Sequence, residues 1–280
     1  MAETAARGAG NEPRPAQGAP SIHVPLPGPL HEARFVERPN RFLLRCELPD
    51  RRLAAVREDR AEPLAAVPAD SAVVDVHMAD PGRLEELLLP GRRVWVRYAA
   101  APTRKTDWSA ALVESPDGHG LVSVDTTLPN RLIRRAIEAG ALDEFHGWTL
   151  ERAEFPLGRS RIDFLLARED RRLALEVKSV TLVEDGVALF PDAVTARGAR
   201  HVRELAAVAG SVDDEGRRWE AAILFVLQRP DAGRIEAARA IDPAFADALA
   251  SAKAAGVRVL GRRCRVTPSH VELGAAVPAG

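Results

Sequence analysis

The stretch GRSRIDFLLAREDRRLALEVKSVTL, residues 158–182, contains two apolar runs separated by a polar turn at 168–172. Such a pattern predicts a β-hairpin. In its second strand Glu176 and Lys178 lie two residues apart and therefore share one face of the sheet. A short hairpin is expected to bring Asp163 of the first strand level with Glu176. The hairpin thus predicts that a carboxylate from each strand meets the other, with a lysine alongside.

This group of side chains is typical of one kind of chemistry. Two neighbouring carboxylates repel each other, and burying either is costly without compensation. Mg²⁺ takes one or two carboxylates and keeps water or phosphate oxygens as its other ligands. A lysine beside the ion can position the attacking water or stabilise charge on a phosphate. The pattern therefore favours metal-assisted phosphodiester hydrolysis, although an exposed ion pair between Glu176 and Lys178, with Asp163 facing solvent, explains the same spacing.

Length and composition limit the classes of protein to which the chain can belong. The chain has 280 residues, 46% of them hydrophobic and 28% charged, which favours two soluble domains. The longest apolar run, 221–227, is far shorter than the ~18 residues of a membrane span. Cys46 and Cys264 form neither a disulfide framework nor a zinc pattern. The formal net charge of −1 argues against binding nucleic acid by bulk charge alone, yet it leaves room for a basic groove. We expect a cytoplasmic protein with no membrane partner.

The chain divides into three predicted parts. Residues 1–30 are rich in Pro, Gly and Ala and are predicted to be a disordered leader. Residues 31–116 contain short strands between turns, with a single helix expected at 81–89, and indicate an OB-like β-barrel. A barrel that serves only packing or dimerisation fits the same pattern. Residues 117–280 predict an α/β domain on a mixed sheet, with helices at 130–139, 195–209 and 243–255.

Several sequence blocks resemble known proteins. Asp163 and Glu176-Val177-Lys178, in the order helix, hairpin, strand, helix, strand, resemble the PD-(D/E)XK nuclease superfamily. The blocks SRIDFLL (160–166), EVKSVTL (176–182) and FPDAVTARG (190–198) are similar to those of the sugar fermentation stimulation protein (SfsA) family. The likeness extends from about residue 34 to about residue 271. It implies a multi-domain α/β protein in which an N-terminal OB-like β-barrel precedes a PD-(D/E)XK nuclease-like mixed-sheet domain that binds DNA.

The resemblance also implies roles for individual residues. Asp163 and Glu176 would be the metal ligands and Lys178 the catalytic lysine, with Mg²⁺ or Mn²⁺ as the cofactor. A further acid is expected at Glu138 or Glu154, and Asp192 either approaches the site or starts the following helix. The chain departs from the family at 78–82, where Met-Ala-Asp-Pro-Gly replaces the usual Cys-Pro-Asn-x-Gly turn. That departure bears on which ligand the barrel binds.

Basic and aromatic residues are candidates for nucleic-acid contacts. Arg104, Lys105 and Trp108 combine charge with an aromatic ring on a barrel loop, as proteins that bind single strands do; a loop folded onto its own tryptophan is the alternative. Phosphate contacts are expected from Arg161, Arg197, Arg200 and His201 near the hairpin, where solvated surface charge is the competing explanation.

The sequence leaves three functions open. It favours a nucleic-acid-binding protein, with DNA as the expected partner, that hydrolyses phosphodiesters with Mg²⁺. The alternatives are a non-catalytic DNA-binding regulator of sugar metabolism that retains the nuclease fold, and an RNA-associated protein that uses the barrel alone. An oligomer is compatible with each of them.

Overall fold

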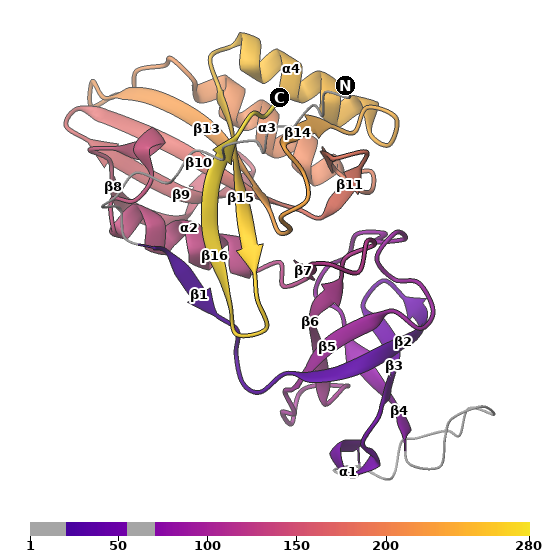
Figure 1. Ribbon diagram of the computed structural model, residues 1–280. Coiled ribbons are helices and arrows are strands. Elements are labelled where there is room, and N and C mark those ends of the chain that lie inside the picture. The colour runs from indigo at the N-terminus through magenta and orange to yellow at the C-terminus, as the bar shows by residue number, and fades with distance from the viewer. Residues whose placement is uncertain (1–20, 55–70) are drawn as a thin grey trace, which may run out of the picture.

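The structure, a computed structural model, describes residues 21–54 and 71–280. The chain forms a β-barrel and a larger α/β domain, and Figure 1 shows the barrel beside one end of that domain. This arrangement confirms the predicted fold class, an OB-like barrel joined to a mixed-sheet domain.

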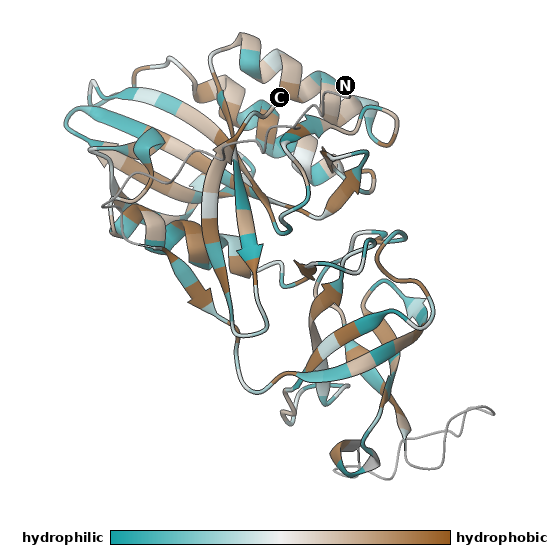
Figure 2. Ribbon diagram, viewed as in Figure 1, coloured by the Kyte–Doolittle hydropathy of each residue, from teal (hydrophilic) through white to brown (hydrophobic). Residues whose placement is uncertain are grey.

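The barrel is a sheet that closes on itself. Its strands follow the order β4-β3-β2-β5-β6-β7, and a parallel pairing of Val76 with Trp108 joins β4 to β6. Side chains alternate between the barrel interior and solvent, as Leu44, Cys46 and Leu48 of β3 show by being buried. Figure 2 shows this alternation of hydrophobic and hydrophilic residues along the barrel strands. The barrel elements are β2 (His31–Asn40), β3 (Leu43–Leu48), α1 (Arg51–Ala54), β4 (Ala72–His77), β5 (Arg93–Tyr98), β6 (Trp108–Glu114) and β7 (Leu121–Ser123).

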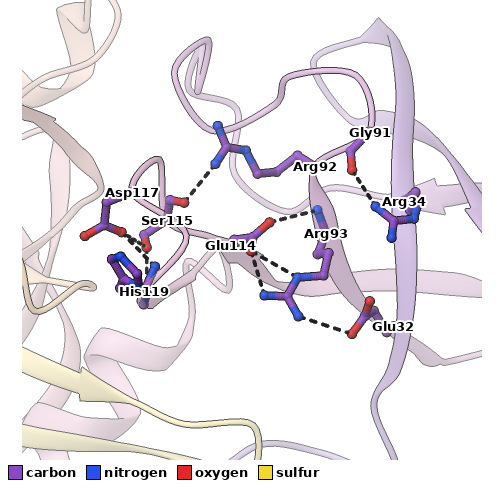
Figure 3. A network of polar contacts seen from close by, with 10 residues as sticks. Glu32, Arg34, Gly91, Arg92, Arg93, Glu114, Ser115, Asp117 and His119 are labelled. Atoms are coloured by element: carbon purple, nitrogen blue, oxygen red, sulfur yellow. Dashed lines mark hydrogen bonds and ion pairs between the residues drawn. The ribbon is translucent and has the colours of Figure 1, made fainter.

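Ion pairs link three barrel strands on the outer surface (Figure 3). The Arg93 guanidinium donates to Glu114 Oε1 through Nη2 at 2.6 Å and Nε at 3.0 Å, and its Nη1 lies 3.7 Å from Glu32 Oε2. The neighbouring Arg92 donates to the carbonyl oxygen of Ser115 at 2.8 Å. These arginines tie β5 to β6 and β2, and half-exposed pairs of this kind contribute little to stability individually.

The α/β domain is built on a mixed sheet with the order β1-β16-β15-β13-β10-β9-β8. A smaller sheet, β11-β12-β14, lies beside it. The central strands β10, β13 and β15 are parallel, and the β9–β10 pair is the predicted hairpin. The elements are β1 (His23–Pro25), α2 (Leu128–Glu138), the 3-10 helix η2 (Asp143–Phe145), β8 (Thr149–Leu157), β9 (Ser160–Arg168), β10 (Arg171–Val180), β11 (Leu182–Glu184), β12 (Val187–Phe190), α3 (Ala196–Val208), β13 (Arg218–Leu227), β14 (Arg234–Ala237), α4 (Pro243–Ala254), β15 (Arg258–Val266) and β16 (His270–Val277).

Helices cover both faces of the main sheet. In β13, Ala222 and Leu224 face a core that also contains Ile133 of α2. The alternate residues Ile223 and Phe225 face a second core, which contains residues of α3 and α4. A strand buried on both faces needs a continuous apolar run, and 221–227 is that run.

Local signals start the helices where the sequence analysis expected them. Pro129 lies in the first turn of α2, where the missing N–H is not needed. The Thr195 hydroxyl caps α3 by accepting from Gly198 N at 3.0 Å, and Asp242 caps α4 by accepting from Phe245 N at 2.9 Å. The predicted helices near 130–139, 195–209 and 243–255 are thus confirmed within a residue or two.

Three expectations differ from the structure. Residues 1–30 were expected to be a disordered leader, but β1 within them pairs antiparallel with β16 and buries Val24. The pairing supplies hydrogen-bond partners to backbone groups at the edge of β16. Residues 1–20 lie outside the described part. β7 pairs with β6, so the barrel sheet continues to Ser123 instead of ending at residue 116. The helix expected at 81–89 is a turn, because Leu84 adopts φ 53° and interrupts helical geometry.

Within residues 21–54 and 71–280, no helix has both the length and the apolar character that crossing a membrane requires.

Candidate functional site

A cleft of about 610 Å³ is lined by residues of both the barrel and the α/β domain. The barrel contributes Arg41 and the loop 79–82, and the α/β domain contributes β10 and the segment 189–195. Asp163, Glu176 and Lys178 all line this cleft. The structure therefore brings together the three side chains that the hairpin pattern singled out.

Asp163 lies where the two hairpin strands separate. The regular ladder between β9 and β10 ends at Phe164 and Leu175, one pair before Asp163. Ile162 and Phe164 lie in different hydrophobic cores, although regular alternation would place them on one face. The register of the last pair sets Asp163 opposite Glu176, as expected for the hairpin, but these two residues form no ladder pair.

Two donors hold the Asp163 carboxylate in the gap between the strands. Its Oδ2 accepts from the backbone N–H of Val177 at 2.8 Å, and its Oδ1 accepts from Asn130 Nδ2 at 2.6 Å. Asn130 belongs to the first turn of α2, so this helix orients the carboxylate. A lone asparagine in a helix carries no distinctive sequence signal, so the residues alone suggest no role for Asn130.

Glu176 is 2% exposed and takes part in a chain of polar contacts. Its Oε1 accepts from Lys178 Nζ and, at 2.5 Å, from His201 Nδ1. His201 Nε2 lies 3.2 Å from Arg197 Nε. Since an arginine nitrogen only donates, Nε2 must be the accepting nitrogen and Nδ1 carries the hydrogen. Arg197 thus orients His201, and His201 orients Glu176.

The two carboxylates differ in acidity. Burial, reinforced by the charge of Glu176, raises the pKa of Asp163 to about 6 against the opposing hydrogen bond from Val177. Burial also acts to raise the pKa of Glu176, but hydrogen bonds from His201 and Lys178 outweigh it and lower that pKa. Glu176 is therefore the more firmly ionised of the pair.

These carboxylates fit a hard divalent cation. Glu176 Oε2 is buried and has no hydrogen-bond partner within the described residues, a costly state that a cation would relieve. Over residues 21–54 and 71–280 no group of three or more His, Cys, Asp or Glu side chains is arranged to hold a metal. Mg²⁺ needs only one or two carboxylates, because it retains several waters. Asp163 and Glu176 are the two carboxylates on the β9–β10 side of the cleft.

Of the further acids expected from the sequence, only Asp192 lines the cleft. Glu138 forms an ion pair of 2.8 Å with Arg134 on the surface of α2. Glu154 lies on β8 and faces Arg161 at 3.9 Å, with both side chains exposed. Glu138 and Glu154 are therefore not placed to complete the site.

Asp192 connects the α/β domain to the barrel. The backbone N–H groups of Arg83 and Leu84 hold its carboxylate, and burial raises its pKa. The carboxylate packs so closely on Gly82 that a Cβ there would overlap it. Thr195, not Asp192, caps α3. Asp192 thus approaches the site from the rim of the cleft and does not start the helix.

Asp80 is a buried acid on the barrel side of the cleft that the sequence analysis did not identify. Its Oδ1 accepts from Gly82 N at 2.8 Å. Burial raises the pKa of Asp80 to about 6, and the nearby charge of Asp192 acts in the same direction while Arg38 opposes it. In the sequence, Asp80 is marked only by its place in 78–82, where the chain departs from the turn that is usual in the family.

The structure places three of the residues expected to contact nucleic acid away from the cleft. Trp108 is 5% exposed and packs edge-on against His31 and Tyr98, so the prediction that it stacks on a base is wrong. Arg104, on the same loop as Lys105, donates to Ser109 Oγ at 2.5 Å within the barrel. These residues lie outside the lining of the cleft.

The basic residues near the hairpin divide into two groups. Arg197 and His201 line the cleft, but His201 is buried and contacts Glu176, so it cannot bind a phosphate as expected. Arg161 and Arg200 lie outside the lining, and Arg200 Nε donates to Ser160 Oγ at 3.2 Å. Arg197 is the member of this group that the cleft makes available.

Comparison with known proteins gives the same division of the chain. The family described as sugar fermentation stimulation protein RE domain matches residues 127–270, and the SfsA N-terminal OB domain matches residues 36–124. A sugar fermentation stimulation protein homolog of Shouchella clausii is 40% identical over 250 residues, covering 89% of this chain and 97% of its own. A homolog of Moorella thermoacetica is 41% identical over 256 residues, with coverages of 91% and 98%.

A solved structure has the same fold. The structure of Pyrococcus furiosus SfsA in complex with Ca²⁺ is 24% identical and superposes with a TM-score of 0.74, covering 92% of this chain and 99% of that one. The two domain matches, the curated relatives and the shared architecture agree with one another, and this chain belongs to the sugar fermentation stimulation protein family.

Proposed function

We propose that this protein binds nucleic acid, with DNA as the favoured substrate, and hydrolyses its phosphodiester bonds with the help of Mg²⁺ or Mn²⁺. The observation that carries this proposal is the buried, unpartnered Oε2 of Glu176 beside Asp163 and Lys178, in a cleft that faces an OB-like barrel. Barrels of this fold commonly bind oligonucleotides. The proposal places the protein with its substrate in the cytoplasm.

A divalent cation fits the residues on the α/β side of the cleft. Asp163 and Glu176 would hold it, and when bound it would polarise a phosphoryl oxygen and neutralise charge on the leaving group. The related Pyrococcus furiosus protein is described in complex with Ca²⁺, another hard cation that prefers oxygen ligands. A hard cation is thus bound by a protein of this fold, and Mg²⁺ or Mn²⁺ are the ions we propose for the reaction here.

In the proposed hydrolysis, two basic side chains of the cleft have distinct roles. Water attacks phosphorus and loses a proton to the solvent, the bond from phosphorus to the 3′ oxygen breaks, and the 3′ oxygen takes up a proton from the solvent to leave as a hydroxyl. Lys178 is held against Glu176 and positions the attacking water. Arg197, whose Nε is fixed on His201, retains its remaining N–H groups to bind a phosphate oxygen.

The test compares cleavage of labelled DNA and RNA by the wild type and by Lys178→Ala, with Mg²⁺, Mn²⁺ or EDTA. Lys253→Ala is the matched control, because Lys253 is an exposed lysine on α4 outside the cleft. We expect metal-dependent cleavage by the wild type and the control, and a loss of at least about 100-fold for Lys178→Ala. Cleavage that is equal in all three proteins would contradict the assignment of the site.

Cation binding can be measured without activity. Because a ligand that binds only the folded state stabilises it, Ca²⁺ at about 100 times its Kd should stabilise the wild type by about 2.7 kcal/mol and raise its Tm. Glu176→Gln should abolish this rise, and Glu138→Gln, on the surface of α2, should retain it. An equal rise in both variants would place the cation elsewhere.

One observation favours a second function, a non-catalytic DNA-binding regulator of sugar metabolism. Lys178 and His201 both bond to Glu176, so part of the carboxylate's charge is compensated by the chain itself. A binder of this kind should shift DNA equally with EDTA and with Mg²⁺ and should leave the DNA intact. Cleavage that Lys178→Ala abolishes would exclude it.

A further inference from the structure

We propose that the cleft takes an unpaired strand of nucleic acid, and that Arg41 and Phe42 of the barrel hold a nucleotide at its mouth. Phe42 would stack on a base and Arg41 would bind a neighbouring phosphate. This inference rests on the proposed function, whose substrate class it narrows.

The two residues form the turn between β2 and β3. Arg41 lines the cleft opposite the strand that carries Glu176 and Lys178, and it is the cation that the described barrel residues contribute to the lining. Phe42 is the next residue and its side chain is 49% exposed. An exposed aromatic residue therefore directly follows a cleft-lining basic residue in the same two-residue turn.

The turn is held rigidly. Arg38 Nη2 donates to the carbonyl oxygens of Arg41 at 2.7 Å and Asp80 at 3.1 Å, which ties the turn to the cleft wall. The Phe42 backbone accepts from Met78 N at 3.0 Å and donates to Asn40 Oδ1 at 2.9 Å. Contacts that fix the backbone in advance reduce the entropy lost on binding. An exposed phenylalanine on so firmly held a turn is preorganised to present its ring.

The distribution of exposed apolar side chains also indicates that a ligand binds near the cleft. Only five large hydrophobic residues of the described chain are prominently exposed. Val194, the most exposed at 72%, lines the cleft, and Phe42 follows the lining residue Arg41 in the chain. Tyr98 is partly engaged in an edge-on contact with Trp108. Phe190 lines the cleft, but its ring packs against Phe225 and Phe245. Phe42 is therefore the exposed phenylalanine next to the cleft-lining residue Arg41.

An unpaired strand fits these features better than a duplex does. A ring stacks only on a base whose face is free, and in a duplex neighbouring bases cover both faces. The cleft, at about 610 Å³, is of the size that holds small ligands. Glu176 lies at its buried end, so a scissile phosphate must enter between the two domains. A flexible single strand can enter in this way.

The charges of the cleft give Arg41 a specific task. Asp80, Asp163, Glu176 and Asp192 line it on both sides, and Lys178 is already bonded to Glu176. Phosphates entering such a cleft meet repulsion unless cations offset it. Arg41 supplies a positive charge on the barrel side, across from Arg197 on the other.

The experiment measures fluorescence anisotropy of labelled dT12, U12 and a 12-base-pair duplex with the full chain in Ca²⁺ and in EDTA. Phe42→Ala should weaken binding of dT12 or U12 between about 5-fold and about 150-fold, because base stacking on an aromatic ring is lost. Phe42→Trp should bind as the wild type does. Arg41→Ala should weaken binding and reduce the slope of log K against log salt by about one. The two single strands distinguish DNA from RNA as the source of the unpaired strand.

Two controls match these variants. Leu89→Ala removes an exposed hydrophobic side chain of the barrel that lies outside the cleft, and Arg52→Ala removes an exposed arginine of α1. Both should bind dT12 as tightly as the wild type. Equal losses in Phe42→Ala and Leu89→Ala, or duplex binding at least as tight as dT12 binding, would overturn the inference, as would an absence of binding to either single strand by the wild type.

The result is separable from the proposed function. If Phe42→Ala weakens dT12 binding but the wild type cleaves nothing with Mg²⁺ or Mn²⁺, the nuclease proposal fails and the single-strand site stands. If the wild type cleaves duplex and single strand equally and Phe42→Ala changes neither, the nuclease proposal stands and this inference fails.

Discussion

His201 Nδ1 and Glu176 Oε1 lie 2.5 Å apart, and both side chains are almost completely buried. One residue comes from helix α3 and the other from strand β10, so a single hydrogen bond connects the helix to the site. Arg197 lies one helical turn before His201 and meets the opposite nitrogen of the ring. The imidazole therefore fixes two cleft residues relative to each other without reaching the cleft solvent itself.

Replacing His201 with two different amides should separate its donor function from its bulk. The Nδ2 of asparagine can take the place of Nδ1, so His201→Asn should keep the hydrogen bond to Glu176. His201→Gln places its amide farther out and should lose it. Because a hydrogen bond to a buried charged group is worth about 1.5–3 kcal/mol, urea unfolding should show the larger loss for glutamine. The Mg²⁺ concentration needed for half-maximal cleavage should also rise more in His201→Gln, and similar values in both variants would contradict a positioning role.

Asp80 should make stability depend on pH. Its pKa is raised to about 6 by burial, above the value of about 4 for an unfolded aspartate. The folded chain therefore holds a proton that the unfolded chain releases, and the associated stability is complete below pH 4 and lost as pH rises through about 6. The loss is of the order of 1–3 kcal/mol. Asp80→Asn keeps an oxygen for the Gly82 N–H and should flatten this part of the curve.

Urea unfolding from pH 4 to pH 7 measures that difference. Asp163 also titrates near pH 6, so the wild-type curve contains both contributions and only the difference between proteins reports on Asp80. Asp75→Asn is the control, because Asp75 is an exposed aspartate of β4. If Asp80→Asn and Asp75→Asn have curves of the same slope, the buried Asp80 carboxyl is not responsible.

Gly82→Ala should weaken the contact between the domains. A Cβ at this position would overlap the Asp192 carboxylate, which the backbone of Arg83 and Leu84 holds in place. Overpacking of this kind costs about 1–3 kcal/mol. Gly233→Ala is a matched control, since nothing lies within 4 Å of a Cβ there. Differential scanning calorimetry should show a lower Tm for Gly82→Ala only; an unchanged Tm would mean that Asp192 moves aside at little cost.

The hairpin and the helices were predictable because their signals are local. Alternation within 158–182 required paired strands, and Thr195 and Asp242 cap the helices that follow them. Glu176 and Lys178 had to share a face because side chains alternate along any strand. The contact that orients the Asp163 carboxylate was not predictable, because its donor Asn130 lies on a helix more than thirty residues earlier.

The functions of the aromatic and basic residues could not be assigned from spacing. Trp108 and Phe42 both lie near basic residues of the barrel, yet Trp108 is buried against His31 and Phe42 is exposed. His201 is a residue type that often binds phosphate, but in the structure it is buried and hydrogen-bonded to Glu176. Which face a side chain takes is set by the closure of the barrel and by helix packing, and both involve distant parts of the chain.

Short-range periodicity and capping thus account for the element types and for the chemistry of Asp163, Glu176 and Lys178, because backbone geometry repeats over a few residues. The cleft itself, with Asp80 and Arg41 on one wall and Asp192 at its rim, exists only after the two domains meet. Burial of charge and contact between domains are properties of the packed molecule. For that reason the raised pKa values, the close fit at Gly82 and the position of Phe42 follow from the folded arrangement and have no counterpart in the linear pattern.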